Sequence, residues 1–345
     1  MKRLLPVLAA IALVAGCVTS QRDPVPAPAA SVDAYLAELN DDNFSGVVLV
    51  AKDFVPFASK ATGYSDRDRG SPNATITPFN IASVTQVFTA VAIGQLVDQG
   101  KVSLDDPLTK YLPTYPKPVG DQITIAMLLD HTAGTADFLS DPGYLGVRDS
   151  FASISDLLAA VNTDPAAATV PGKSFAYSNT GYLLLGAVIE KASGRDYYEY
   201  MDNEVFAKAG VAAGFLHNTE EERSNRGFAL GYGPDERKNW SVLPVRGTPA
   251  GGAYATAPDL LSFHKALATG ALTRPETANR LVLSPPTAAK TASGLTSGVF
   301  AGDDVGASAV FGMTTKGYTV IVLANVGGAA QPVAERILKL LAAAS

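Results

Sequence analysis

The sequence predicts a mixed α/β protein that is large enough for two lobes. Its 345 residues are 47% hydrophobic and 17% charged, a globular composition with enough apolar side chains for a large core. Apolar runs typical of buried strands lie near both ends of the chain, at Phe44–Ala51 and Tyr318–Ala324. Between these runs, apolar residues recur at helical spacing, most clearly from Phe88 to Val97.

The N-terminus has the features of a targeting segment. Lys2 and Arg3 precede the apolar run Leu4–Ala15, which is too short for an ordinary membrane-spanning helix. The following Val14-Ala15-Gly16-Cys17 resembles a bacterial lipobox, which implies a signal peptide over residues 1–16 and a lipid on Cys17. Val18 after the cysteine points by analogy to the outer membrane, facing the periplasm. The alternative is an ordinary secretory signal with an incidental cysteine.

A proline-rich tether should connect this segment to the folded domain. Residues 17–30 contain Pro24, Pro26 and Pro28 among alanines, a composition that favours extended backbone. The folded domain is therefore predicted over residues 31–345. Ser31 is expected to cap its first helix, Ser31–Leu39, which has one apolar face.

Further elements follow from local patterns. Phe44–Ala51 and Val55–Gly63 are predicted to pair as strands. Ala309–Met313 and Tyr318–Ala324 are predicted to pair across a polar turn at Thr314–Gly317. The remaining predicted helices are Ile123–Asp130, Phe151–Val161, Tyr182–Ala192, which stops at Gly194, and Pro332–Leu341, which is expected to pack back on the sheet.

The central stretch of the chain is Pro78–Gly100, in which a loop carrying Ser83 leads into a buried helix. A serine at this place has two interpretations. Its hydroxyl can accept a bond from a free backbone N–H as an N-cap, or it can be a nucleophile at a helix N-terminus that favours nearby negative charge.

The residues around Ser83 favour the nucleophile. Asn80-Ile-Ala-Ser-Val-Thr-Gln86 resembles the first motif, Ser-x-x-Lys, of the serine β-lactamase and penicillin-binding-protein superfamily, in its class C, D-aminopeptidase and esterase branch. Pro171-Gly-Lys-Ser-Phe-Ala-Tyr177-Ser-Asn179 resembles the second motif, and Ala250–Leu260 the Gly-Gly strand and capped helix. The resemblance covers nearly the whole mature chain. It implies a two-lobed β-lactamase/transpeptidase-like fold: an antiparallel sheet flanked by helices, an all-helical lobe, and a cleft between them.

The resemblance also implies roles for individual residues. Ser83 matches the nucleophile, Tyr177 the motif tyrosine and Asn179 the substrate-orienting amide. His131, in a segment similar to the family's His-Thr-Ser-Gly, is expected to tie down a turn. Two departures stand out: Gln86 occupies the lysine position, and the third motif, expected near Phe300–Gly302, has no lysine or histidine anywhere in Gly294–Gly306.

These departures weaken the predicted catalytic site. A glutamine amide has no basic nitrogen, and a tyrosine without a neighbouring cation titrates near its reference pKa of about 10. Asp303 and Asp304 would place negative charge where an oxyanion or substrate carboxylate should bind. Loss of a general base typically costs ~10²–10⁴-fold in rate. The sequence therefore argues against efficient β-lactam hydrolysis.

Two functions remain open. One is an envelope lipoprotein with a degenerate site and weak or no acyl transfer, whose cleft binds peptidoglycan-like peptides or a partner; the loss of two basic groups favours it. The other is an active serine esterase or D-amino-acid peptidase or carboxypeptidase that uses Ser83 and Tyr177 on an ester or other small acyl substrate.

Composition and the remaining residues exclude other classes. A net charge of −6 without a basic run gives no reason to expect nucleic acid. Three scattered histidines and a single cysteine make no metal-ligand set, and no cofactor is predicted. His217 and His264 are expected on the surface. No Gly-x-Ser-x-Gly elbow occurs, which argues against an α/β-hydrolase.

Overall fold

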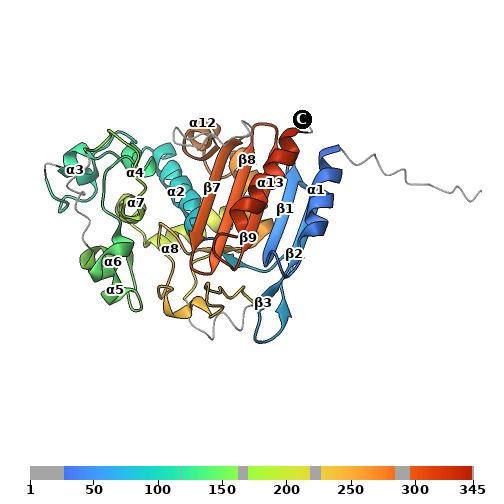
Figure 1. The fold of residues 1–345 in the computed structure, drawn as a ribbon. Helices are drawn as coiled ribbons and strands as arrows, with labels where there is room; N and C mark the ends of the chain where they lie inside the picture. The colour runs from blue at the N-terminus through green and yellow to red at the C-terminus, as the bar shows by residue number, and fades with distance from the viewer. Residues whose placement is uncertain (1–26, 118, 162–169, 218–226, 284–295, 344–345) are drawn as a thin grey trace, which may run out of the picture.

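A computed structural model describes residues 27–117, 119–161, 170–217, 227–283 and 296–343. The predicted signal peptide and Cys17 lie outside the described residues. The structure has a sheet with helices on both faces and, beside it, a group of helices from α3 to α7 (Figure 1). Within the described part of the chain, no helix is long and apolar enough to cross a membrane.

The sheet has five antiparallel strands in the order β2-β1-β9-β8-β7. Their bounds are β1 Gly46–Lys52, β2 Val55–Thr62, β7 Thr296–Asp304, β8 Ala307–Thr314 and β9 Tyr318–Ala324. Val47 and Leu49 of β1 face one core cluster and Val48 and Val50 face the other, so this strand is buried on both faces. Double burial explains its continuous apolar sequence. The two strand pairs predicted from the sequence are confirmed.

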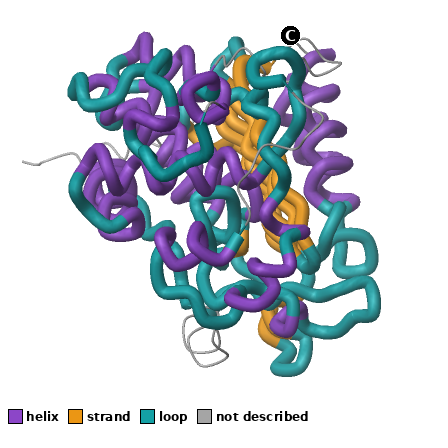
Figure 2. The backbone as a smooth tube through the Cα atoms, turned by 90° about the vertical axis from the view of Figure 1, so that its left-hand side faces the viewer, coloured by secondary structure: helices purple, strands orange, loops and turns teal. Residues whose placement is uncertain are grey.

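Helices cover both faces of the sheet (Figure 2). Helices α1 (Ala27–Glu38) and α13 (Ala330–Ala343) contact each other over one face, and α13 packs on β8 and β9, as predicted for the terminal helix. On the other face, α11 (Ala257–Ala268) contacts β1 and β9. The mixed α/β fold with an antiparallel sheet, predicted from the sequence, is confirmed.

The helical part is built around two longer helices, α2 (Gln86–Asp98) and α7 (Asn179–Ser193), which pack on each other. Gly194 ends α7 in the left-handed conformation, with φ of 73°, as the sequence signal indicates. The other helices here are α3 Val119–Gln122, α4 Ile125–Leu129, α5 Pro142–Val147, α6 Ile154–Ala160, α8 Tyr197–Tyr200, α9 Ala207–Ala209 and α12 Pro275–Ala278. Short strands complete the fold: β3 Tyr64–Asp66, β4 Ser71–Pro72, β5 Phe79–Asn80 and β6 Tyr254–Ala255.

Three expectations need correction. Helix α1 begins at Ala27, so Ser31 lies inside it rather than capping it, and the tether ends earlier than residue 30. Proline is compatible with a first helical turn because the N–H it lacks has no intrahelical partner there. His264 is buried, and its Nδ1 lies 2.8 Å from Thr319 Oγ1, so it is not a surface residue. The residue pattern alone did not predict strand β7, which the family resemblance implied only as the third motif near Phe300–Gly302.

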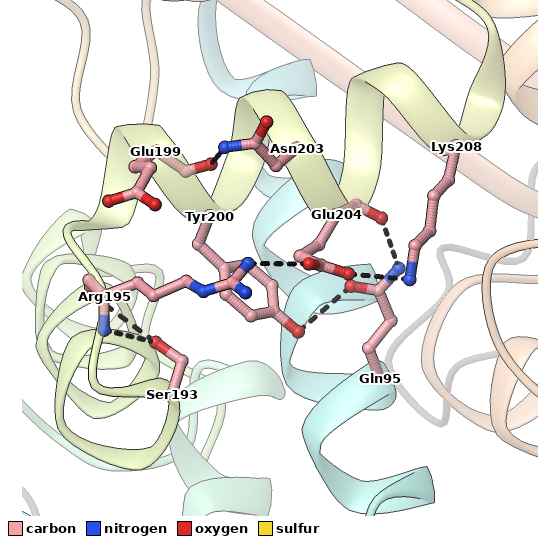
Figure 3. A network of polar contacts seen from close by, with 8 residues as sticks. All are labelled: Gln95, Ser193, Arg195, Glu199, Tyr200, Asn203, Glu204 and Lys208. Carbon is pink, nitrogen blue, oxygen red and sulfur yellow. Dashed lines mark hydrogen bonds and ion pairs between the residues drawn. The ribbon is translucent and has the colours of Figure 1, made fainter.

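A buried glutamine joins α2 to the segment after α8, where Met201–Phe206 forms a π-helical turn (Figure 3). Gln95 is 4% exposed; its Nε2 donates to the Glu204 carbonyl at 2.8 Å and its Oε1 accepts from the Tyr200 hydroxyl at 3.1 Å. On the surface above, the Glu204 carboxylate pairs with Arg195 and Lys208 at 2.7 and 2.6 Å.

We expect Gln95→Leu to lower the free energy of unfolding by about 2 kcal/mol, because it removes the hydrogen bonds of a buried amide to the Glu204 carbonyl and the Tyr200 hydroxyl. The matched control is Lys208→Ala, which removes one exposed ion pair and should cost about 0.5 kcal/mol or less. Urea unfolding of both variants measures the difference. Equal losses would show that the surface ion pairs, rather than the buried amide, hold this turn.

Candidate active site

Ser83 lies in a short 3₁₀ turn, η1 (Ala82–Thr85), between β5 and α2. The turn is fixed from both ends: Ala82 N donates to Asn80 Oδ1 at 2.9 Å, and Thr85 Oγ1 donates to the Ala82 carbonyl at 2.6 Å. Ala82 itself has a positive φ of 45°, an uncommon conformation for a residue with a side chain. No side chain caps either η1 or α2, so the capping interpretation of Ser83 is wrong.

Gln86 is buried at the start of α2, one turn after Ser83, and its amide orientation is fixed by its partners. Nε2 donates to the Ala250 carbonyl at 3.2 Å. A carbonyl only accepts, so the nitrogen rather than the oxygen of the amide must face it. The same nitrogen donates to the Tyr177 hydroxyl at 2.8 Å and lies 3.5 Å from Asn179 Oδ1.

The Tyr177 hydroxyl lies between Gln86 and Ser83. The hydroxyl oxygen accepts a hydrogen bond from Gln86 Nε2. Its own proton has two acceptors within reach, Ser83 Oγ at 2.8 Å and Asn179 Oδ1 at 3.3 Å, and the shorter bond is the one to Ser83. Although the residue is 46% exposed, burial of its hydroxyl end raises the pKa of Tyr177 above 10.0, and the bonds to Ser83 and Gln86 only partly offset this. Gln86 thus donates to Tyr177, and Tyr177 donates to Ser83. Activation of a serine nucleophile requires the opposite, a neighbouring group that accepts the serine proton.

Asn179 is oriented by Asp137, a residue that the sequence analysis missed. Asp137 Oδ2 accepts from Asn179 Nδ2 at 2.8 Å and from its backbone N–H at 3.2 Å, while Oδ1 accepts from Leu139 N at 3.0 Å. Because the amide nitrogen of Asn179 is used in this way, its oxygen faces Tyr177 and Gln86. Asp137 follows the turn at His131 but belongs to none of the family motifs matched above, and only the fold brings it to Asn179.

His131 packs against the ring of Tyr177. Its ring stacks on Tyr177 with centroids 4.5 Å apart, and its Nδ1 accepts from Ser178 N at 3.3 Å. Burial lowers the pKa of His131 to about 4, so the ring is neutral at pH 7. These are the contacts of a residue that fixes a turn, and none of the described hydrogen bonds of His131 reaches Ser83.

The third expected element, Phe300–Gly302, lies beside Ser83 on β7. A Cβ placed on Gly302 would come within 2.5 Å of Ser83 N, so the two backbones are in close contact. The predicted register of this segment is therefore supported by the position of Gly302. Phe300, where the family has a basic residue, packs against the hydrophobic core.

A cleft of about 190 Å³ opens over Ser83. The described residues that line it are Asn80, Ala82, Ser83, Phe138, Leu139, Tyr144, Tyr177, Asn179, Leu243, Pro244, Thr248, Ala250, Gly251, Gly252, Asp303 and Asp304. They include two aspartates and no lysine, arginine or histidine. Other lysines that could in principle replace the missing base lie on other elements. Lys52 Nζ donates to the Lys316 carbonyl at the β8–β9 turn, and Lys60 is on β2, the edge strand opposite β7.

The chain belongs to the beta-lactamase family, whose model matches residues 32–344. The described fold is that of β-lactamase-like serine hydrolases, and Ser83, Tyr177 and Asn179 line one cleft in it.

Among individual proteins, the chain is 30% identical over 247 residues to the putative penicillin-binding protein PbpX of Bacillus subtilis, covering 70% of this chain and 58% of that protein. It is 31% identical over 211 residues to penicillin-binding protein 4 of Amycolatopsis lactamdurans, covering 59% and 54%. The chain thus spans about half the length of the curated relatives that it matches.

Solved structures agree on the fold. A penicillin-binding protein of Bacillus halodurans superposes with a TM-score of 0.75 at 29% identity, over 90% of this chain and 98% of that one. A structure of SurE with D-Leu superposes with a TM-score of 0.69 at 28% identity, over 90% and 74%. D-amino acid amidase of Ochrobactrum anthropi has the same fold, with a TM-score of 0.71 at 22% identity, over 91% and 96%.

Proposed function

We propose that this protein binds a peptide-like or cell-wall-like ligand in the cleft over Ser83, with weak or no acyl transfer. The observation that carries the proposal is the hydrogen bond from Gln86 Nε2 to the Tyr177 hydroxyl. Gln86 stands at the position of the motif lysine, and its amide is a neutral donor rather than a base. No basic group among the described lining residues takes the proton of Ser83. The raised pKa of Tyr177 keeps its hydroxyl protonated at pH 7, so that residue is not available as a base either.

An active serine esterase or D-amino-acid peptidase is the second candidate. It is favoured by the 2.8 Å contact between Tyr177 and Ser83 and by the glycine-lined approach of β7 to the Ser83 backbone. The names of the similar proteins, which include penicillin-binding proteins and SurE with D-Leu, are compatible with such substrates.

We also propose that the protein is held in the bacterial envelope by a lipid on Cys17, at the outer membrane and facing the periplasm. The basis is the sequence alone: a charged start, a short apolar run and the lipobox-like residues before Cys17. In that setting the ligand of the cleft would be a peptidoglycan-like peptide or a partner.

Acylation of Ser83 separates the two candidate functions. Intact mass is measured after incubation with a fluorophosphonate and, separately, with a penicillin, and Ser83→Ala is the control. We expect no stoichiometric adduct within the time that an active family member needs, because loss of the base slows attack ~10²–10⁴-fold. A stoichiometric adduct that Ser83→Ala removes would establish the hydrolase instead.

A further inference from the structure

The register of the sheet gives it two ends that carry different groups. Strand β7 closes at Asp304, which lines the cleft, and we call this the cleft end. At the other end, which we call the turn end, lie two hairpin turns, residues 52–55 and 314–317. These turns are in contact, since Asp53 N donates to the Gly317 carbonyl at 2.8 Å. The eight residues of β8 span roughly 24 Å between the two ends.

The described chain starts at the turn end. Helix α1 contacts β2, and just after this helix Asp41 Oδ1 accepts from Gly63 N at 2.7 Å, beside the last residue of β2. The close of α1 therefore lies at the cleft end, and its start at Ala27 lies toward the turn end, where α13 closes (Figure 1). The tether residues 17–26 can reach at most about 35 Å. An anchor on Cys17 would therefore hold the turn end close to the membrane surface.

Exposed basic side chains from separate parts of the chain meet at the turn end. They are Lys52 on β1, Lys265 on α11, Lys316 between β8 and β9, and Lys339 on α13. Helix α11 is held there by His264, next to Lys265, whose ring meets that of Phe54 edge-on with centroids 5.0 Å apart. Helix α13 starts at the cleft end, where Ala330 N donates to Ser308 Oγ at 3.1 Å, and so runs toward the turn end.

The charge of these lysines is open to a ligand. Among the described residues, no ion pair involves Lys265, Lys316 or Lys339, whereas Lys52 pairs with Asp53. Asp53 is the one acidic residue of the two turns. Val55, which is 67% exposed, adds an apolar side chain to the same surface. In a chain with a net charge of −6, this group of lysines is a local reversal of sign.

We propose that the turn end docks on a bilayer with anionic phospholipid headgroups, so that the cleft end points away from the membrane that holds the protein. This rests on the proposed lipid anchor at Cys17, which keeps the turn end at a high effective concentration beside that bilayer. The lysines complement the headgroup phosphates, and the exposed Val55 side chain adds apolar contact. Ligands then reach the cleft from the side that faces away from this membrane.

Energy transfer from tryptophan to a dansyl headgroup lipid tests the orientation. Because Cys17 is the only cysteine, a maleimide-bearing lipid couples the mature chain to vesicles at that residue alone, whether or not a cell lipidates it. The donors are Val55→Trp at the turn end and Val305→Trp at the cleft end, two exposed valines, with the signal of native Trp240 subtracted. On vesicles of phosphatidylcholine and phosphatidylglycerol at low ionic strength, we expect several-fold more transfer from position 55, and a smaller difference in salt.

Lysine variants test the contribution of charge. Each of Lys265→Gln, Lys316→Gln and Lys339→Gln, made in the Val55→Trp chain, should lower the ratio of docked to undocked protein by about 5-fold, the effect of one lysine near an anionic surface. The control is Lys173→Gln, which makes the same change of charge at an exposed residue in the stretch before Tyr177, on the cleft side. It should leave the ratio unchanged.

Four results would each overturn the docking surface: equal transfer from positions 55 and 305, more transfer from position 305, the same pattern on phosphatidylcholine alone, or an equal loss in Lys173→Gln. The anchor itself is tested separately by the intact mass of the protein extracted from bacterial membranes. An unmodified Cys17 with docking retained would refute only the proposed anchor, and a lipidated Cys17 without docking would refute only this inference.

Discussion

Gln86→Lys is expected to raise the rate of Ser83 acylation by about 10²-fold or more, because it restores a group that can hold and transfer the proton of Ser83. The environment of Gln86 Nε2 suits a lysine ammonium. Its neighbours are the Ala250 carbonyl, the Tyr177 hydroxyl oxygen and Asn179 Oδ1, within 3.2, 2.8 and 3.5 Å, and all three can accept.

The lysine would act on Tyr177 as well as on Ser83. A cation beside the phenol lowers its pKa, opposing the effect of burial that raises it in the native protein. Tyr177 would then accept the Ser83 proton more readily, and the direction of the hydrogen-bonded chain could reverse. The two measurements are hydrolysis of p-nitrophenyl acetate and the rate of fluorophosphonate labelling followed by intact mass.

Gln86→Met is the matched control, since methionine has similar length but neither donor nor charge. It should give no gain over the native protein. If Gln86→Lys folds and also gives no gain, the missing base is not the only defect, and the aspartates and Phe300 on β7 would account for the remaining loss.

Residues whose role depends on local sequence were predicted well. The central strands follow from unbroken apolar runs, and the helix around Tyr182 from its spacing and from Gly194. The convergence of Ser83, Gln86, Tyr177 and Asn179 follows from the family resemblance, and the observed distances between their side chains agree with it.

Residues whose role depends on tertiary contacts were missed. Asp137 meets Asn179 only through the packing of the segment before η3 (Phe138–Ser140) against α7. The Ala250 carbonyl, which fixes Gln86, is a backbone atom without any sequence signature. His264 was placed on the surface because its pairing with Thr319 joins α11 to β9, which are far apart along the chain.

The residue pattern did not reveal strand β7 because the strand carries residues that shape the cleft. Glycines and two aspartates interrupt its apolar pattern, and such residues are depleted in strands. Gly302 is needed because β7 passes the Ser83 backbone too closely for a side chain, and the aspartates line the cleft. The features that give the cleft its shape and charge are thus the ones that hide the strand from pattern analysis.

Gly302→Ala is expected to lower the free energy of unfolding by about 2 kcal/mol. The added Cβ would lie 2.5 Å from Ser83 N, 2.8 Å from the Ile81 carbonyl oxygen and 2.9 Å from Ala82 Cβ. Two of these are backbone atoms of a turn fixed by Asn80 and Thr85, so they cannot move aside cheaply, and overpacking of this kind costs about 1–3 kcal/mol.

Gly312→Ala on the neighbouring strand β8 is the matched control. There the nearest atoms to an added Cβ are at 3.6 Å or more, an ordinary van der Waals contact, so the change should cost about 1 kcal/mol less than Gly302→Ala. Urea unfolding of both variants gives the comparison. If the two alanines cost the same, β7 can withdraw from Ser83 without penalty, and the close approach of the two backbones does not determine the shape of the cleft.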